Sequence, residues 1–211
     1  MHDLFLSKGQ RWFLSPIRRG SFVGLLKSAS FAFLKRNLMA NLSIDPQSTL
    51  PQVAAAVEKF LKEAGFSVAS KDLSRPWGGF FVLEEAQIRN FKNTFFPEVQ
   101  LSEEQFSQKL SPKFLLVAPG ARLSWQYHFR RAELWNLVAG DAAIARSLDD
   151  HQGEVNSLVA GEVISLAQGE RHRLIGASSW GVVAEIWMHS NPGFPSDESD
   201  IVRLQDDYAR Q

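Results

Sequence analysis

The sequence contains no cysteine, and only five of its 211 residues are histidine. The missing thiols exclude disulfides, thiolate metal sites and a cysteine nucleophile. Their absence also fits a reducing compartment, and we expect a cytoplasmic protein. Any metal site must therefore rely on histidine, carboxylate or amide ligands.

An excess of one charge and long apolar runs are absent as well. The 23 basic and 23 acidic side chains cancel, which removes a whole-chain electrostatic argument for nucleic-acid binding. No apolar run reaches the roughly 18 residues that a membrane-spanning helix needs, so we expect no integral membrane span. The remaining composition, 45% hydrophobic and 22% charged, is typical of a globular protein that buries a substantial core.

The first 40 residues differ from the rest of the chain. They hold seven basic side chains against a single acidic one, Asp3, among many Phe, Leu and Ser residues. This composition is typical of an organelle-targeting segment or a membrane-surface segment. Alternatively, Met39 is the true start and the upstream residues are a misassigned extension. We exclude residues 1–40 from the fold prediction.

Residues 41–73 predict a helical lead-in. Thr49 can cap a helix that has Pro51 in its first turn and ends at Gly65. Apolar residues recur at helical spacing, which predicts a helix packed on the outside of the main domain. These apolar residues are Val53, Val57, Phe60 and Leu61.

From Trp77 onward, short apolar runs alternate with Gly, Pro, Asp and Ser. This rhythm predicts an all-β antiparallel sandwich or barrel. We also expect two short helices, Ser102–Leu110, with Ser102 as its cap, and Asp200–Tyr208 at the end of the chain. The predicted strands are Phe80–Leu83, Phe114–Val117, Leu134–Ala139, Ala142–Ala145, Val163–Leu166 and Val182–Met188.

Four polar residues on this β framework form a candidate metal site. Gln126 and His128 lie two apart, which on a strand places both side chains on one face. Glu133 follows a short turn, and His172 follows a glycine-containing turn in a later element. Two imidazoles, a carboxylate and an amide oxygen suit Zn, Mn, Fe or Ni. The alternative is that the histidines are hydrogen-bonded core residues, but two of the four histidines after the leading segment fit the pattern.

The stretches that carry these residues resemble a known family. Gly120–Gly140 (GARLSWQYHFRRAELWNLVAG) and Gly161–Leu174 (GEVISLAQGERHRL) are similar to the two signature motifs of the cupin superfamily. The run PGARLSWQYHFRRAELW in particular resembles the cupin domain of type II phosphomannose isomerases. The Ser74–Leu83 and Asp200–Arg210 runs resemble that family's leading strand and C-terminal signature. The resemblance implies a cupin jelly-roll barrel, also called a double-stranded β-helix, over residues 74–211.

The chain departs from the family's pattern in several places. Gln126 begins the ligand set where the common cupin form has histidine. None of the departures removes a proposed metal ligand, but together they weaken the transfer of the exact substrate. Because no nucleotidyltransferase domain precedes the motifs in this sequence, we do not expect a bifunctional sugar-nucleotide enzyme. The other departures are Phe129, Arg130 and Leu134 at common histidine positions, Ala167 for proline and Ala209 for glycine.

Proton transfer and substrate binding would fall to other charged residues. Glu185 is the candidate general base, and the alternatives are a carboxylate that supports the metal ligands or one that faces solvent. Lys113 is a candidate proton shuttle or anion-binding residue. Arg122 has the strand parity of Gln126 and His128, so we expect it to point inward and bind an anionic group. Family positions add Arg75, Arg131 and Arg203 as candidate substrate-binding residues, with surface salt bridges as the alternative favoured for Arg131 and Arg203.

The resemblance implies a metal-dependent isomerase of sugars or sugar phosphates, which interconverts an aldose and a ketose as mannose-6-phosphate isomerases do. Its cofactor would be a divalent metal ion and its partner a small sugar or sugar phosphate. Two other classes stay open, an iron dioxygenase on the same barrel and a cupin that binds sugars without turnover. Gln126 argues against the dioxygenase, because imidazole-rich ligand sets suit iron–oxygen chemistry better. Cupins often pair through edge strands, so a homodimer is also a family expectation.

Overall fold

The computed structural model describes residues 42–209, which belong to one compact unit. The basic segment predicted at residues 1–40 lies outside the described residues. In the described part β-strands predominate, as predicted, and none of its helices combines the length and apolar character needed to cross a membrane. In chain order the elements are α2 (Leu50–Glu63), β1 (Val68–Arg75), β2 (Gly78–Leu83), η1 (Glu85–Gln87), α3 (Ile88–Phe95), α4 (Glu103–Phe106), β3 (Lys113–Val117), β4 (Trp125–Tyr127), β5 (Arg131–Ser147), β6 (Val155–Ser157), β7 (Val163–Leu166), β8 (Arg171–His189) and β9 (Val202–Gln205).

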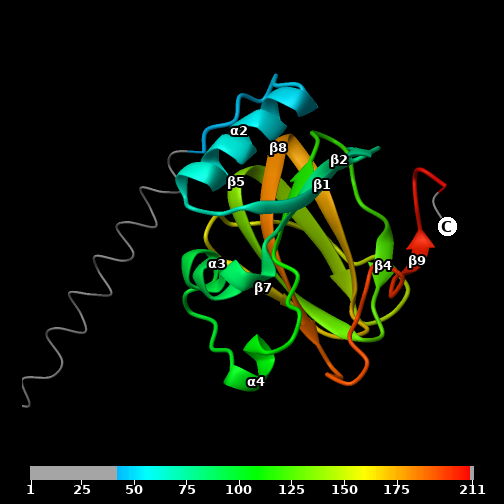
Figure 1. Cartoon of the computed structure of the whole chain (residues 1–211). Coiled ribbons are helices and arrows are strands. Elements are labelled where there is room, and N and C mark those ends of the chain that lie inside the picture. The colour runs from blue at the N-terminus through cyan, green and yellow to red at the C-terminus, as the bar shows by residue number, and fades with distance from the viewer. Residues whose placement is uncertain (1–41, 210–211) are drawn as a thin grey trace, which may run out of the picture. The chain divides into compact units, whose positions relative to one another are not determined.

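Antiparallel pairing joins the described strands into one sheet that curls back on itself (Figure 1). Across the sheet the order is β1, β2, β3, β8, β4 and β9, while β5 pairs with β6, β7 and β8. The long strands β5 and β8 pair from Arg131 and His189 at one end to Ser147 and Arg171 at the other. This long bent pair connects the two halves of the barrel.

Gly140 lies where β5 bends. Its φ of +76° is in the left-handed region, and a Cβ atom there would overlap the backbone carbonyl oxygen of Trp180 on β8. Only glycine can adopt this φ without strain and also leave room for the carbonyl oxygen. The predicted strands Leu134–Ala139 and Ala142–Ala145 are therefore two halves of one strand, with the bend between them.

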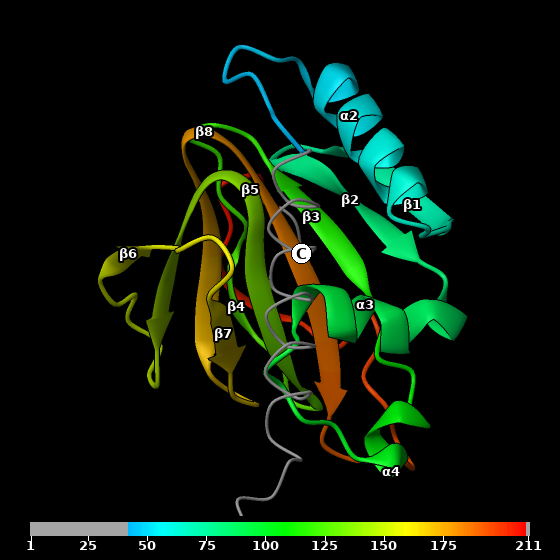
Figure 2. The same cartoon turned by 90° about the vertical axis from the view of Figure 1, so that its left-hand side faces the viewer.

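Strand alternation divides the apolar residues between two cores. On β3, Phe114 and Leu116 pack outward with residues of the helices, whereas Leu115 and Val117 belong to the core inside the barrel. Helices α2 and α3 lie over the outer face of the sheet (Figure 2). The polar strand residues described below, such as Lys113 and Glu185, alternate in step with the inward-facing apolar residues. Strand alternation therefore directs their side chains into the barrel interior.

The predicted lead-in helix is confirmed as α2. It begins after Thr49, whose backbone N–H donates to the Gln52 side chain at 2.8 Å, and it carries Pro51 in its first turn. It ends just before Gly65, which has a φ of +81°. The predicted apolar stripe is buried in the outer core, as expected for a helix packed on the outside of the sheet.

Some local predictions near the sheet edges are wrong. The segment Asp200–Tyr208 contains strand β9 rather than a helix, because it pairs with β4. The helix predicted over Ser102–Leu110 begins after Ser102 as expected but ends at Phe106. Strand β1 begins at Val68, inside the predicted helical lead-in, and pairs with β2. Both errors over strands arise because pairing with a distant segment overrides the local pattern.

Candidate metal centre and cavity

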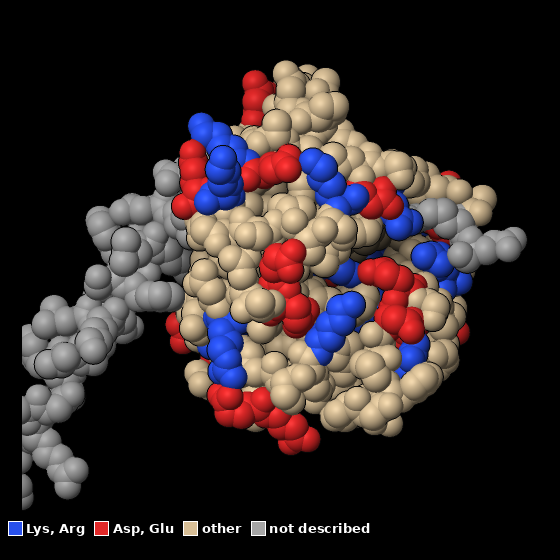
Figure 3. Space-filling model, in the orientation of Figure 1, with Lys and Arg blue, Asp and Glu red and all other residues tan. Residues whose placement is uncertain are grey.

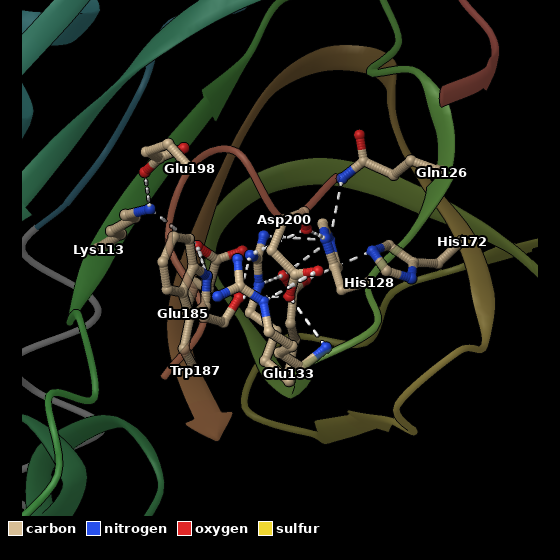
Figure 4. Close-up of polar contacts among 12 residues, drawn as sticks. Lys113, Gln126, His128, Glu133, His172, Glu185, Trp187, Glu198 and Asp200 are labelled. Carbon is tan, nitrogen blue, oxygen red and sulfur yellow. Dashed lines mark hydrogen bonds and ion pairs between the residues drawn. The ribbon is translucent and has the colours of Figure 1, made fainter. Parts of the chain in front are cut away.

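His128, Glu133 and His172 converge inside the barrel, and all three side chains are buried. Nε2 of His128 lies 3.1 Å from Oε1 of Glu133, and Nε2 of His172 lies 3.4 Å from Oε2 of the same carboxylate. Strands β4 and β8 pair at Gln126 and His172, and this register brings the early residues beside the late one. The four residues predicted as metal ligands are thus brought together (Figure 4).

Backbone carbonyls fix the direction of both imidazoles. Nδ1 of His128 donates to the carbonyl oxygen of Asp200 at 2.5 Å, and Nδ1 of His172 donates to that of Glu170 at 2.9 Å. In the deprotonated form that metal binding requires, the remaining hydrogen stays on Nδ1 and each ring presents its Nε2 lone pair toward the centre of the group. Metal-binding histidines are held in this way, since the outer hydrogen bond sets the tautomer and the ring orientation.

Two atoms of the group lack the partners that buried polar atoms need. Oε2 of Glu133 and Nε2 of His172 face each other, yet neither makes a hydrogen bond. Such orphaned atoms are costly unless a further group satisfies them. The ligand atoms of the three residues all lie within 4.8 Å of one another, so the group could hold a metal ion. Its nitrogen and oxygen donors fit a divalent transition metal ion.

Glu133 is held in its ionised form. Burial opposes ionisation, but the neighbouring His128, His172 and Arg131 side chains together hold the pKa of the Glu133 carboxyl well below its usual range. An ionised carboxylate is the form that coordinates a cation. Nε of Arg131 donates to Oε1 of Glu133 at 2.8 Å, and its Nη2 lies 3.1 Å from Nε2 of His128. Positive charge is therefore already directed at this group.

Gln126 stands beside the group with its amide. Its Nε2 lies 3.5 Å from Nε2 of His128, and its Oε1 accepts a hydrogen bond from the Ser124 hydroxyl at 2.6 Å. A metal ligand would need the amide oxygen on the histidine side. Turning the amide over provides this, because the Ser124 hydroxyl can accept from Nε2 as readily as it donates to Oε1. Gln126 is therefore in place for a fourth ligand.

A cavity of about 210 Å³ opens beside this group, and its wall includes Gln126 and Glu133. On the surface shown in Figure 3, basic and acidic side chains are interspersed. The cavity wall is also of mixed charge, because it includes the acidic residues Glu133, Glu185 and Glu198 as well as basic ones. Four of the predicted cationic residues line the cavity, namely Arg75, Lys113, Arg131 and Arg203.

Lys113 and Glu185 lie opposite each other on strands β3 and β8 and face the cavity. Both are buried, with Nζ of Lys113 4.0 Å from Oε2 of Glu185. The Glu185 carboxyl accepts hydrogen bonds from the indoles of Trp135 and Trp187, each at 3.0 Å. Burial, followed by the negative charge of Glu133, raises the pKa of Glu185 to about 7. Because Glu185 is buried, the alternative in which its carboxylate faces solvent is wrong. A carboxyl with this pKa can exchange protons near neutral pH.

Arg122 does not point inward, contrary to the prediction. Its guanidinium forms an ion pair with Asp207, and its side chain is 45% exposed. The prediction assumed an unbroken strand as far as His128, but β4 spans only Trp125–Tyr127. Side chains alternate reliably only along a continuous strand. Arg131, in contrast, lies inside the barrel, where it is buried beside Glu133. The prediction that favoured a surface salt bridge for Arg131 is therefore wrong.

Two residues that support the site were not predicted from the sequence, namely Asp200 and Glu198. The Asp200 carboxylate accepts from the backbone N–H groups of Phe129 at 3.1 Å and Arg130 at 2.9 Å, directly after His128. Glu198 accepts from Nζ of Lys113 at 2.6 Å. Asp200 begins the run that resembles the family's C-terminal signature, which was a usable signal. Glu198 precedes that run and differs little from an ordinary acid of a surface loop.

A curled antiparallel sheet with a buried His–Glu–His group beside an inner cavity defines the class of this protein as a cupin. The family is more specific. Residues 93–206 match the family described as mannose-6-phosphate isomerase C-terminal, and the chain belongs to it. The matched region contains all four candidate metal ligands together with Lys113 and Glu185.

Curated relatives are much longer than the part they share with this chain. The chain is 28% identical over 159 residues to mannose-1-phosphate guanylyltransferase of Salmonella montevideo, an alignment that covers 75% of this chain and 28% of that protein. It is 29% identical over 152 residues to xanthan biosynthesis protein XanB of Xanthomonas campestris pv. campestris strain B100, covering 71% and 26%. The chain thus spans less than a third of the length of these relatives.

Similar solved structures include a Cupin 2 conserved barrel domain protein from Salinispora arenicola CNS-205. It is 22% identical, with a TM-score of 0.33, and the alignment covers 38% of this chain and 64% of that one.

Proposed function

We propose that this chain is a metal-dependent isomerase that interconverts an aldose phosphate and a ketose phosphate, of the mannose 6-phosphate type. The observation that carries the proposal is Glu185, a buried carboxyl with a pKa of about 7 that faces the same cavity as Gln126 and Glu133. Aldose–ketose isomerisation moves a proton between adjacent carbons, and it needs a general base that works near neutral pH. The description of the family, which names mannose-6-phosphate isomerase, agrees with this reaction.

The candidate metal ligands meet a second requirement of the reaction. Gln126, His128, Glu133 and His172 would hold a divalent cation, which when bound supplies Lewis-acid polarisation of a sugar oxygen. The orphaned atoms of Glu133 and His172 and the fixed imidazole directions support this assignment.

In the aldose-to-ketose direction, Glu185 would take the proton from the carbon beside the carbonyl and return it to the former carbonyl carbon. The hydroxyl proton on the carbon that Glu185 deprotonates would pass to the former carbonyl oxygen, with Lys113 as the candidate shuttle. The indoles of Trp135 and Trp187 hold one carboxyl oxygen each, so the base is fixed in direction. Lys113 at 4.0 Å favours the ionised form of Glu185 and can donate a hydrogen bond to a sugar oxygen.

Phosphate binding would fall to the cations of the cavity wall. Arg75, Lys113 and Arg203 line the cavity, and Nε of Arg75 forms an ion pair with Asp72 at 2.9 Å. Guanidinium and ammonium groups form charge-assisted hydrogen bonds with phosphate oxygens, which are roughly twice as strong as neutral ones. A phosphorylated sugar is therefore a better fit than a neutral sugar.

The test is conversion of mannose 6-phosphate to fructose 6-phosphate by protein loaded in turn with Zn, Mn, Fe and Ni. Turnover that is lost with a chelator and in Glu185→Gln, while the exposed control Glu154→Gln stays active, would support the proposal. Tight binding of the sugar phosphate without turnover in every metal form would instead indicate a non-catalytic binding protein. Oxygen consumption with ferrous iron would indicate a dioxygenase.

A further inference from the structure

Glu198 reaches into the cavity and engages the ammonium group of Lys113. The two atoms lie 2.6 Å apart, and both residues line the cavity. The partners differ sharply in exposure, because the Lys113 side chain is 6% exposed and the Glu198 side chain 71% exposed. The cation of this pair therefore belongs to the barrel interior, whereas its anion is largely exposed to solvent. Figure 4 shows the two side chains facing each other.

Lys113 has contacts that hold its ammonium group in place without Glu198. Nζ lies 3.5 Å from the ring centroid of Trp187 and 5.7 Å from that of Phe80. A cation over an aromatic face is attracted by the ring. The Glu185 carboxyl adds a third contact at 4.0 Å. If Glu198 moves away, the ammonium group stays directed at the cavity.

The loop that carries Glu198 is fixed on both sides of it. Ser196 and Asp200 are buried, and the Ser196 hydroxyl donates to the Asp200 carboxylate at 2.6 Å. Nη1 of Arg131 donates to the Ser196 hydroxyl at 2.8 Å. Glu198 lies between these anchors, so its side chain can turn toward solvent without release of the loop.

We propose that Glu198 is a built-in competitor for the anionic group of the ligand. Its carboxylate takes the position on Lys113 that a phosphate monoester would take, and the incoming phosphate displaces it into water. This inference rests on the proposed function only for the class of ligand, a phosphorylated sugar.

The competition would make the cavity selective. A phosphate dianion has more charge and more acceptor oxygens than a carboxylate, so it can replace Glu198 on Lys113. A neutral sugar has no group that can break the ion pair. Because Glu198 is largely exposed, returning its carboxylate to water costs little. Glu198 is thus a specificity-determining residue that rejects ligands without a strongly charged group.

The test is calorimetric titration with inorganic phosphate at neutral pH. Glu198→Gln should bind phosphate about tenfold more tightly than the wild-type chain, because its neutral amide is a weaker competitor for Lys113. Glu154→Gln, which removes the same charge from an exposed site elsewhere, should bind phosphate like the wild type. In a Lys113→Met background, Glu198→Gln should bring no gain.

Phosphate affinity that is equal or weaker in Glu198→Gln would overturn this proposal. So would a similar gain in the Lys113→Met background, or no phosphate binding by either the wild type or Glu198→Gln. The measurement does not depend on turnover. If phosphate binding behaves as expected and mannose 6-phosphate is not isomerised, the proposed function fails and the role of Glu198 stands.

Discussion

Nδ1 of His128 donates a hydrogen bond to the backbone carbonyl of Asp200, 72 residues further along the chain. The carboxylate of the same Asp200 accepts from the backbone N–H of Arg130. A single residue near the C-terminus therefore fixes both the ring of a candidate metal ligand and the turn that follows it. The C-terminal run that resembles the family signature acts on the first motif through these contacts.

We expect Asp200→Asn to weaken binding of a divalent metal ion by about tenfold, because it disturbs the turn after His128 and with it the outer hydrogen bond that orients this ligand. The substitution replaces a carboxylate oxygen that accepts from backbone N–H groups by an amide that cannot accept at both positions. Competition with a chromophoric chelator measures the affinity. Asp197→Asn, at a 62% exposed side chain nearby, serves as the control. Equal affinities for the two variants would show that the Asp200 carboxylate is not needed to orient His128.

Glu185 should make the stability of the metal-free protein fall as pH rises. Its pKa is raised from 4.5 to about 7 in the folded state, so its contribution is fully present below pH 4.5 and is lost as pH rises through 7. The loss amounts to about 3 kcal/mol. Glu185→Gln has no proton to lose there and should lack this decline. Urea unfolding at a series of pH values measures it, and parallel curves for the two proteins would contradict the burial of an ionisable Glu185.

Arg122→Ala should lower the free energy of unfolding by less than about 1 kcal/mol, as is usual for exposed ion pairs. It should leave phosphate affinity unchanged, because its guanidinium pairs with Asp207 outside the cavity. Strand parity alone predicts the opposite, a selective loss of phosphate-bearing ligands. Phosphate titration of Arg122→Ala decides between the two, and a clear loss of affinity would place Arg122 in the site after all.

Gly140→Ala should destabilise the protein far more than Gly120→Ala. Both glycines have positive φ, +76° and +69°, so both substitutions carry the left-handed penalty of about 1–2 kcal/mol. Only Gly140 adds an overlap with a backbone carbonyl, while a Cβ at Gly120 would meet no atom within 4 Å. Thermal unfolding of both variants measures the difference. Similar melting temperatures would mean that β5 and β8 can separate at the bend without a large cost.

The sequence predicts those parts of the site that depend on short spacings. Gln126 lies on strand β4, and His128, two positions later, directly follows that strand. Glu185 lies within the long strand β8, along which side chains alternate regularly. Helix α2 was predictable for the same reason, since its cap and apolar stripe are local. Parity fails at Arg122 because β4 is short.

Contacts between distant segments could not be predicted from the sequence in the same way. The Lys113–Glu198 pair joins residues 85 apart, and the β9 segment adopts a strand only because β4 is beside it. The contacts that anchor Ser196 and Asp200 decide which acidic residue of the C-terminal loop reaches the cavity. The local sequence pattern does not predict these contacts.

The proposed metal centre requires that His128, Glu133 and His172 share one cation. Elemental analysis of the protein after metal loading and desalting should find about one divalent ion per chain in the wild type. His128→Ala and Glu133→Gln should each retain less than about a tenth of that amount. His151→Ala, at a 96% exposed histidine, should keep full occupancy. Full metal content in His128→Ala or Glu133→Gln would contradict the assignment of these residues as ligands.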